Sequence, residues 1–338
     1  MLEEWLDLSL DALSSVKGEG RVPGGHYRVE APGILELRPD TPTRQARACV
    51  LSAGIHGNET APIELLGDCL ARLEAGLIPL GAPVLVILGN PEAIRRGVRY
   101  VGTNLNRLFR RDLEESGMEA DLARALMASV DAFYMRQAGR ARLHYDLHTA
   151  IRTSRYPRFV VEPHADTPTA PEQWSWLAGA DIQAVLHQHR HSWTFSHYSR
   201  HYHAAQAFTL ELGHALPFGH NDLAALVPMR RSLEALISGR LPAAAESAKM
   251  AFFRVEQELI RKADDFRLCF PDDTPNFTEF APNTLLAQDA RAGDTRVADR
   301  SLGVVFPNAE VEIGARAALL VRRTPPPAST SLRTFNHP

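Results

Sequence analysis

Cysteine, long apolar runs and a leader segment are all scarce or missing in this chain. Its three cysteines, Cys49, Cys69 and Cys269, are too few and too scattered to form a disulfide framework. No apolar run approaches the roughly 20 residues that a membrane-spanning helix needs. Residues 1–5 are acidic and lack the basic start and apolar centre of a signal peptide. We therefore expect a cytoplasmic protein with no membrane partner.

Excess charge of either sign is also missing. The chain carries 37 Lys and Arg against 40 Asp and Glu, a net charge of −3. This balance gives no general reason to bind nucleic acid or an anionic membrane surface. Affinity for an acidic small molecule would therefore have to come from arginines placed at the site itself. The composition does not indicate an oligomer, and it does not exclude one.

Apolar sequence, by contrast, is plentiful. Hydrophobic residues make up 45% of the 338 positions, enough for a large core, and the length favours more than one domain. Two continuous apolar runs, residues 48–55 and 84–90, are typical of buried central strands. Residues 60–76 between them have helical apolar spacing and close on a glycine. Further strands are predicted at 143–148 and 207–212, and further helices at 119–138 and 223–237. The pattern predicts an α/β domain over residues 1–240, with a mixed central sheet flanked by helices.

The character of the sequence changes after residue 240. Residues 241–247 form a short Pro/Ala-rich stretch that suits a linker. Beyond it, short apolar runs are split by Pro, Asn and Gly, which favours a smaller β-rich domain over residues 250–323. The predicted strands are 255–260, 285–288 and 302–307. The tail, residues 324–338, is rich in Pro, Ser and Thr and is predicted to be disordered.

Two polar segments that follow predicted strands carry the residues of a metal site. His56 and Glu59 lie in the loop after the first apolar run, at the sheet edge where open α/β folds place ligands. His148 ends a second predicted strand. Two histidines and one glutamate leave the fourth position of zinc open for water, as in several zinc hydrolases. Asp146 lies on the same face of the strand as His148 and is expected to accept a hydrogen bond from it. The pattern predicts a zinc hydrolase with one ion per chain.

Glu211 is the predicted general base. It interrupts the apolar run of residues 208–212, where packing alone would favour an apolar side chain. A zinc hydrolase needs a group that takes a proton from water and returns it to the leaving amine. The alternative is a glutamate on an edge strand that faces solvent.

Arginines gather in two segments that follow predicted strands. Arg99 and Arg107, with Asn106 beside the latter, follow the second apolar run, and three more arginines lie in residues 151–158. A guanidinium group binds a carboxylate through two hydrogen bonds, so these loops could bind an acidic substrate. The alternative is a solvated basic loop.

Histidines are concentrated in residues 187–220, which hold eight of the fourteen. One interpretation is a second metal site, since His187, His189 and His191 would share one face of a strand. The interpretation we favour from the sequence is a polar loop in which one or two histidines touch substrate.

Five segments together resemble the succinylglutamate desuccinylase and aspartoacylase family of the zinc carboxypeptidase superfamily. They occur in order through the first domain, and the β-rich last third of the chain also suits that family. The segments are Gly54–Pro62, Asn104–Phe109, Asp146–Ala150, Thr194–Tyr198 and Thr209–Gly213. The last two favour the desuccinylase branch.

The resemblance implies that His56, Glu59 and His148 bind zinc and that Glu211 is the general base. Members of this family usually have Asp where this chain has Asn104. Any negative charge that the Asp contributes beside the metal is therefore missing here.

The resemblance also implies substrate roles for the loop after the second apolar run. Asn106 and Arg107 would hold a substrate carboxylate near the metal, and Arg99 would assist at the carbonyl. The implied reaction is hydrolysis of N-succinyl-L-glutamate to succinate and L-glutamate, the last step of arginine catabolism by the succinyltransferase pathway.

Two alternatives remain from the sequence. One is another N-acyl amino acid deacylase, for example one that acts on N-acetylaspartate. The other is a non-catalytic metal-binding or sensor protein that has kept the fold. Related enzymes also use a tyrosine from late in the chain, whereas the last tyrosine here is Tyr202, so Tyr198 or Tyr156 would have to replace it.

Overall fold

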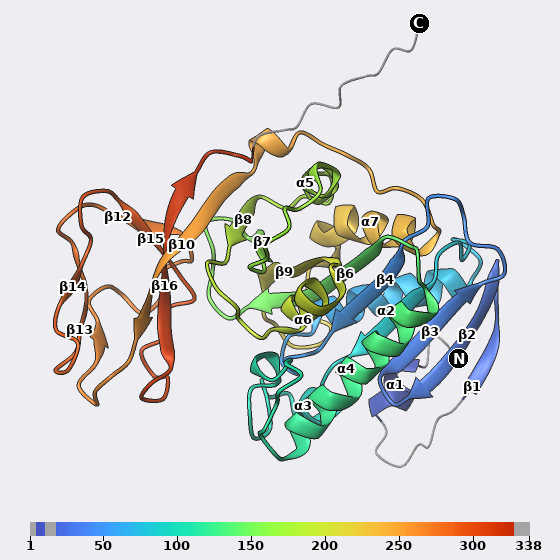
Figure 1. Cartoon of the computed structure of the whole chain (residues 1–338), viewed down its shortest axis with the longest axis horizontal. Coiled ribbons are helices and arrows are strands. Elements are labelled where there is room, and N and C mark those ends of the chain that lie inside the picture. The colour runs from blue at the N-terminus through green and yellow to red at the C-terminus, as the bar shows by residue number, and fades with distance from the viewer. Residues whose placement is uncertain (1–4, 11–17, 328–338) are drawn as a thin grey trace, which may run out of the picture.

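A long mixed sheet runs through the whole molecule (Figure 1). The computed structural model describes residues 5–10 and 18–327. The strands of the large sheet are β1 (Gly18–Val22), β2 (Gly25–Ala31), β3 (Ile34–Pro39), β4 (Ala48–Ala53), β5 (Val84–Leu88), β6 (Arg142–Ala150), β7 (Arg158–Glu162), β8 (Ala184–His187), β9 (Gln206–His214), β10 (Ala251–Ile260), β12 (Thr278–Phe280), β15 (Leu302–Val305) and β16 (Arg316–Thr324). A second sheet contains β11 (Arg267–Leu268), β13 (Leu285–Gln288) and β14 (Thr295–Arg296).

Parallel strands occupy the centre of the large sheet. Over the described residues its order is β1-β2-β3-β5-β4-β6-β9-β7-β8-β10-β16-β15-β12. Strands β5, β4, β6 and β9 run parallel to one another, so their carboxyl ends lie at one edge. The four predicted central strands are thereby confirmed. Three antiparallel strands, β1 to β3, extend the sheet on one side and were not predicted.

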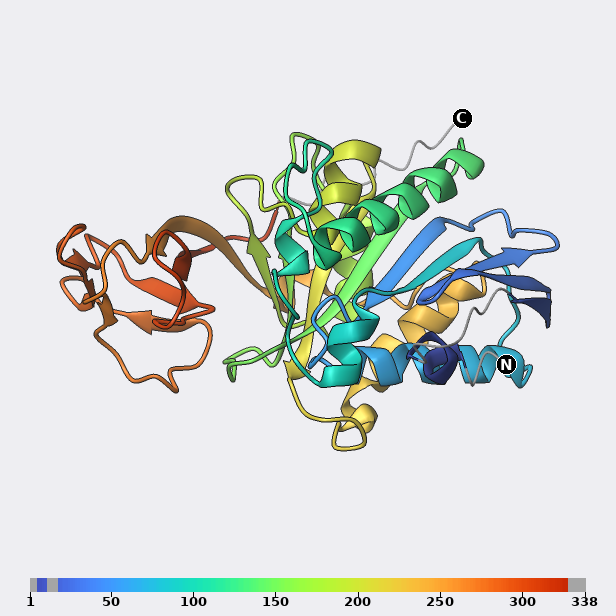
Figure 2. The same ribbon diagram turned by 90° about the horizontal axis from the view of Figure 1, so that it is seen from below.

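Helices cover both faces of the central strands (Figures 1 and 2). Alternation along β4 divides the core: Cys49 and Leu51 pack on the side of α2, α5 and α7, whereas Ala48 and Val50 pack on the side of α4 and α6. The predicted mixed sheet flanked by helices is confirmed. No helix in the described part of the chain is long and apolar enough to cross a membrane. The helices are α1 (Trp5–Leu10), α2 (Ala61–Glu74), α3 (Pro91–Arg96), α4 (Met118–Arg136), α5 (Pro171–Gly179), α6 (Phe195–His203) and α7 (Val227–Ile237), with 3₁₀ turns η1 (Leu105–Arg107), η2 (Leu223–Leu226) and η3 (Ser247–Lys249).

The C-terminal β-rich domain is joined to the central strands of the large sheet by hydrogen bonds. Strand β10 starts at Ala251, earlier than the predicted 255, and its first four residues pair in parallel with β8. From Phe252 to Ile260 the same strand pairs antiparallel with β16, with two register shifts. Figures 1 and 2 show the small domain projecting from the end of the sheet through these two strands. The predicted tail began at Thr324, but this residue is the last of β16 and pairs with Phe252. Residues 328–338 lie outside the described residues.

Candidate metal centre and active-site cleft

The loop after β4 is shaped by close packing against α3. A Cβ atom on Gly57 would lie 2.1 Å from the backbone carbon of Ala93, so a larger residue cannot occupy this position without moving the backbone. The Gly57 N–H donates to the carbonyl of Arg99 at 3.1 Å, which ties the loop to the next polar segment. His56 and Glu59, on either side of this contact, are held at the carboxyl edge of the sheet before α2 begins.

The three predicted metal ligands come together, and we call His56, Glu59 and His148 the inner cluster. One candidate ligand atom from each residue lies within 4.8 Å of the other two. The His56 Nδ1 atom is 2.9 Å from one carboxylate oxygen of Glu59, and the His148 Nδ1 atom is 2.8 Å from the other. The side chains are almost wholly inaccessible, at 4%, 2% and 2% exposure respectively. The structure therefore collects two nitrogen donors around one carboxylate in a buried position.

A further layer of polar groups orients the two imidazole rings. The His148 Nε2 atom lies 3.0 Å from Asp146 Oδ2, which confirms the predicted contact. Asp146 in turn accepts a hydrogen bond of 2.6 Å from the Ser52 hydroxyl. The His56 Nε2 atom lies 3.1 Å from Asn104 Oδ1, so a neutral amide stands behind this ring, at the position where the family resemblance led us to expect a carboxylate. Both Nδ1 atoms are thus turned toward Glu59, the arrangement that a shared metal ion requires.

The inner cluster favours positive charge. Burial raises the pKa of Glu59, but the two histidines outweigh burial and hold that pKa well below its usual range. Burial lowers the pKa of His148, but Asp146 and Glu59 reverse the effect and raise it well above the usual value. The His148 ring, which lies between the carboxylates of Asp146 and Glu59, therefore favours its positively charged form. The donor set and this preference for positive charge both fit a divalent metal ion.

Glu211 lies beside the inner cluster and points into the cleft. Strand β9 is central, between β6 and β7, and its register sets Glu211 next to His148. This position excludes the alternative of an edge-strand glutamate. The side chain is 7% exposed, and its Oε2 atom has no hydrogen-bond partner. Burial and the nearby negative charge of Glu59 raise the pKa of Glu211 to about 7. A buried carboxylate with such a pKa can accept and return a proton near neutral pH.

The inner cluster and Glu211 open onto a cleft of about 470 Å³. Arg99, Asn106 and Arg107 line it, as the sequence predicted for this loop. The Asn106 amide oxygen accepts a hydrogen bond from the backbone N–H of Phe195 at 2.9 Å, which leaves the amide nitrogen as the group that can donate into the cleft. The structure thus brings together the seven residues to which the sequence assigned metal-binding, general-base and substrate roles: His56, Glu59, His148, Glu211, Arg99, Asn106 and Arg107.

Positive charge gathers in the cleft. Arg99 donates to Glu59 Oε1 at 2.8 Å. Arg107 is reached by solvent through the cleft, yet the surrounding protein and the charges of Arg316 and Arg99 lower its pKa to about 9. Arg152 also lines the cleft and donates to the backbone carbonyl of Pro307 at 3.1 Å. Guanidinium groups that repel one another in a cleft are suited to an anionic ligand that pairs with them.

Sequence reasoning missed the contribution of the C-terminal domain to this cleft. Phe306, Asn308 and Arg316 line it from the loop after β15 and the start of β16. Burial lowers the pKa of Arg316, with Glu258 acting against the shift. The sequence signal was weak, because a single arginine before an apolar strand is common. Only the pairing of β10 with β8 brings this arginine near the metal ligands.

Other sequence expectations are corrected. Strand β8 ends at His187, so His189 and His191 lie in a loop and do not share a strand face with it. That loop does line the cleft, but through Gln188, Ser192 and Thr194 and not through its histidines.

Neither proposed tyrosine replacement reaches the cleft lining. The hydroxyl of Tyr198 donates to Asp131 at 2.6 Å. Tyr156 packs against Phe253 and Phe277 in the core shared by the two domains. The tyrosine that the resemblance led us to expect therefore has no counterpart among the cleft-lining residues that the structure describes.

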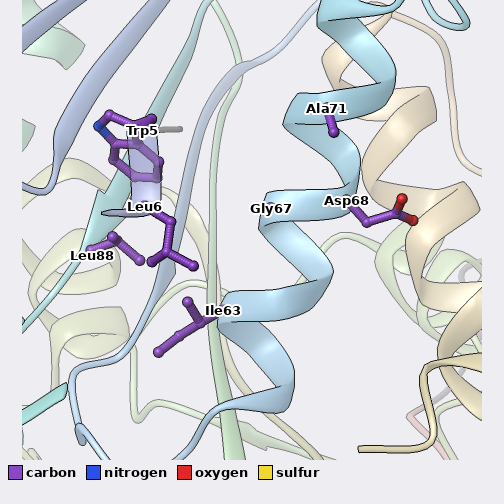
Figure 3. A pocket seen from close by; sticks show the side chains of 7 residues that line it. All are labelled: Trp5, Leu6, Ile63, Gly67, Asp68, Ala71 and Leu88. Carbon is purple, nitrogen blue, oxygen red and sulfur yellow. The ribbon is translucent and has the colours of Figure 1, made fainter. Parts of the chain in front are cut away.

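A second pocket, of about 190 Å³, lies between α1 and α2 (Figure 3). Trp5 and Leu6 of α1 face Ile63 and Gly67 of α2, whereas the side chain of Asp68, the charged residue among those that line the pocket, points away from α1. Asp68 forms an ion pair of 3.3 Å with Arg230. A small apolar pocket whose carboxylate is already paired offers no catalytic group.

Comparison with known proteins finds two family models that match successive parts of the chain. The family model for the succinylglutamate desuccinylase/aspartoacylase catalytic domain matches residues 45–237. The model for the AstE/AspA barrel-sandwich hybrid domain matches residues 248–324.

Similar proteins cover nearly the whole chain. Succinylglutamate desuccinylase of Serratia proteamaculans is 41% identical over 95% of this chain and 97% of its own length. The protein of that name from Pseudomonas paraeruginosa is 45% identical over 86% of this chain and 89% of its own. A crystal structure of the Vibrio parahaemolyticus enzyme superposes with a TM-score of 0.87 at 34% identity and covers 94% of both chains.

Proposed function

Since the chain belongs to the succinylglutamate desuccinylase/aspartoacylase family, we propose that it hydrolyses the amide bond of N-succinyl-L-glutamate to succinate and L-glutamate. The observation that carries this proposal is the unpaired, buried carboxylate of Glu211 beside the inner cluster, at the base of a cleft lined by arginines. A hydrolase of an acidic amide needs both features: a proton acceptor near the metal and cations for the substrate.

The proposed cofactor is one zinc ion per chain, held by His56, Glu59 and His148. When bound, zinc supplies a Lewis acid that polarises the amide carbonyl and lowers the pKa of water. Glu211 takes a proton from the attacking water and passes it to the leaving amine of glutamate. Its raised pKa suits both transfers, because the group must gain and lose a proton at the same pH.

The substrate carries three carboxylates, and the cleft that contains the metal ligands is also lined by Arg99, Arg107, Arg152 and Arg316. We assign Asn106 and Arg107 to a carboxylate near the metal. Arg99 assists at the carbonyl; its contact with Glu59 already holds its guanidinium beside the inner cluster. Arg316 of the C-terminal domain repels Arg107 and is the group we assign to the succinyl carboxylate.

This reaction would serve as the last step of arginine catabolism by the succinyltransferase pathway. The proposed partner is a small acidic N-acyl amino acid. The predicted cytoplasmic location and the absence of nucleic-acid and membrane partners stay predictions.

The deciding experiment is steady-state hydrolysis of N-succinyl-L-glutamate by the zinc-loaded protein, with N-acetyl-L-aspartate in parallel. We expect a kcat/KM of about 10⁴ M⁻¹s⁻¹ or more on the succinyl substrate, within the usual enzyme range, and far less on the acetyl compound. Turnover of the acetyl compound alone would indicate that the chain is a deacylase of the aspartoacylase type. If neither is cleaved while zinc is bound, the chain is a metal-binding protein and the proposal is wrong.

A further inference from the structure

Three histidines converge outside the inner cluster, and we call His191, His197 and His201 the outer cluster. One ring nitrogen from each lies within 4.8 Å of the other two. His197 and His201 are one turn apart on α6, and His191 comes from the loop that precedes this helix. Residues four apart on a helix face the same side, which is a common way to present two imidazoles to one ion. The three members therefore come from two structural elements that pack together.

The three imidazole rings of the outer cluster contact one another. The His191 Nδ1 atom lies 2.8 Å from the His197 Nε2 atom, so one proton is shared between two nitrogens. His197 is fully buried, and its Nδ1 atom has no hydrogen-bond partner. Trp193 stacks on His191, with ring centroids 5.4 Å apart and planes at 25°. Buried polar atoms normally have a hydrogen-bond partner, and the protein supplies none for this nitrogen of His197.

We propose that the outer cluster is a second metal site, which binds a divalent transition ion such as Zn²⁺, Co²⁺ or Ni²⁺. Imidazole is a preferred ligand for such ions, and three of them leave one position for water. His191 and His201 are exposed, so an ion can enter from solvent.

The outer site would fix part of the cleft wall. The segment between His191 and His197 contains Ser192, Thr194 and Ser196, and all three line the cleft. The Thr194 hydroxyl also accepts a hydrogen bond from the backbone N–H of His197, at the start of α6. An ion that ties the loop to the helix therefore holds these cleft residues in place without touching the substrate.

Stoichiometry tests the proposal directly. Metal-free full-length protein is titrated with Zn²⁺ or Co²⁺, and bound metal is counted after equilibrium dialysis. We expect two ions per chain for the unmodified protein and one for His201→Gln. His220→Gln is the matched control, since it removes an exposed histidine from the same histidine-rich region and should keep two ions. His191→Gln, in an exposed loop, repeats the test at a second position. One ion in the unmodified protein, or two in both cluster variants, would overturn the proposal.

A second measurement separates this site from the inner one. His56→Gln weakens the inner cluster and should still bind one Co²⁺ ion at the outer cluster, with the visible absorption of cobalt bound to nitrogen. The double variant His56→Gln/His201→Gln should lose that absorption. Because the readout is metal binding and not turnover, a wrong assignment of the substrate leaves this test intact. Equal absorption in the single and double variants would refute the outer site.

Discussion

The inner and outer clusters have similar donors but different surroundings. In the inner cluster, Asp146 and Asn104 fix the far side of each ring, and a carboxylate joins the two histidines. In the outer cluster, the described ring contacts are with one another and with the aromatic rings of Trp193, His164 and Tyr202. The two clusters differ in the residues that contact the ligands. We infer that Asp146, Asn104 and the free carboxylate of Glu211 suit the inner cluster to catalysis, whereas the outer cluster is suited only to binding an ion.

The largest expected effect comes from removing an inner ligand. His148→Gln should lower kcat/KM by about 10⁴-fold or more, because the loss of the metal removes several kcal/mol of charge stabilisation. The same variant should keep the ion of the outer cluster. Activity is measured by steady-state hydrolysis and metal content by elemental analysis. Retained turnover with only the outer cluster filled would reverse the roles that we assign to the two clusters.

Removing the base should separate metal binding from chemistry. Glu211→Gln should lower kcat by about 10³-fold, within the range typical of a lost general base, while the inner cluster keeps its ion. Single-turnover kinetics and metal analysis on one preparation give both quantities. Substantial remaining turnover would exclude Glu211 as the base.

Arg316 should affect substrate binding more than chemistry. Arg316→Met should raise the KM for N-succinyl-L-glutamate by roughly 10- to 100-fold, the range expected from one charge-assisted hydrogen bond. Arg323→Met, at the exposed far end of the same strand, is the matched control and should leave KM unchanged. Equal effects of the two variants would show that the C-terminal domain acts only by stabilising the fold.

The protonation of Glu211 should appear in the pH profile. The base is active without its proton, so kcat/KM should rise with pH up to about 7 and fall roughly tenfold per unit below it. Glu211→Gln should remove this acidic limb from its residual activity. A limb that persists in the variant would belong to another group.

The smallest effect is expected at Asn104. Asn104→Asp introduces a carboxylate next to His56 Nε2. The added charge should make His56 a stronger ligand and tighten binding at the inner cluster by up to about tenfold. Competition with a chelator measures this affinity, and metal binding at the outer cluster, which does not contact Asn104, is the internal reference. Weaker binding in the variant would contradict the proposed role.

Local patterns predicted the centre of the molecule well. Buried parallel strands read as continuous apolar runs, and the polar residues that follow β4 and β6 meet because parallel strands end at the same edge. His56, Glu59, His148 and Glu211 were therefore accessible to sequence reasoning.

The contacts between segments far apart in the sequence could not be predicted from local patterns. The approach of Arg316 depends on the contact between β8 and β10, and the outer cluster depends on how the loop after β8 folds back on α6. Periodicity tells which face a side chain occupies, but it does not tell which distant segment will lie opposite. For this reason the histidine-rich region suggested His187, His189 and His191, whereas the structure gathers a different set.

The pairing of β10 with β8 also has a consequence for the newborn chain on the ribosome. Domains emerge from the N-terminus, so α7, which ends at Ile237, is synthesised before residues 251–254. Until those residues emerge, one edge of β8 has exposed backbone donors and acceptors that another chain could pair with. A ribosome that stops in the linker would release a catalytic domain with an open sheet edge. Synthesis of β10 thus covers this edge of β8 and removes a site at which nascent chains could aggregate.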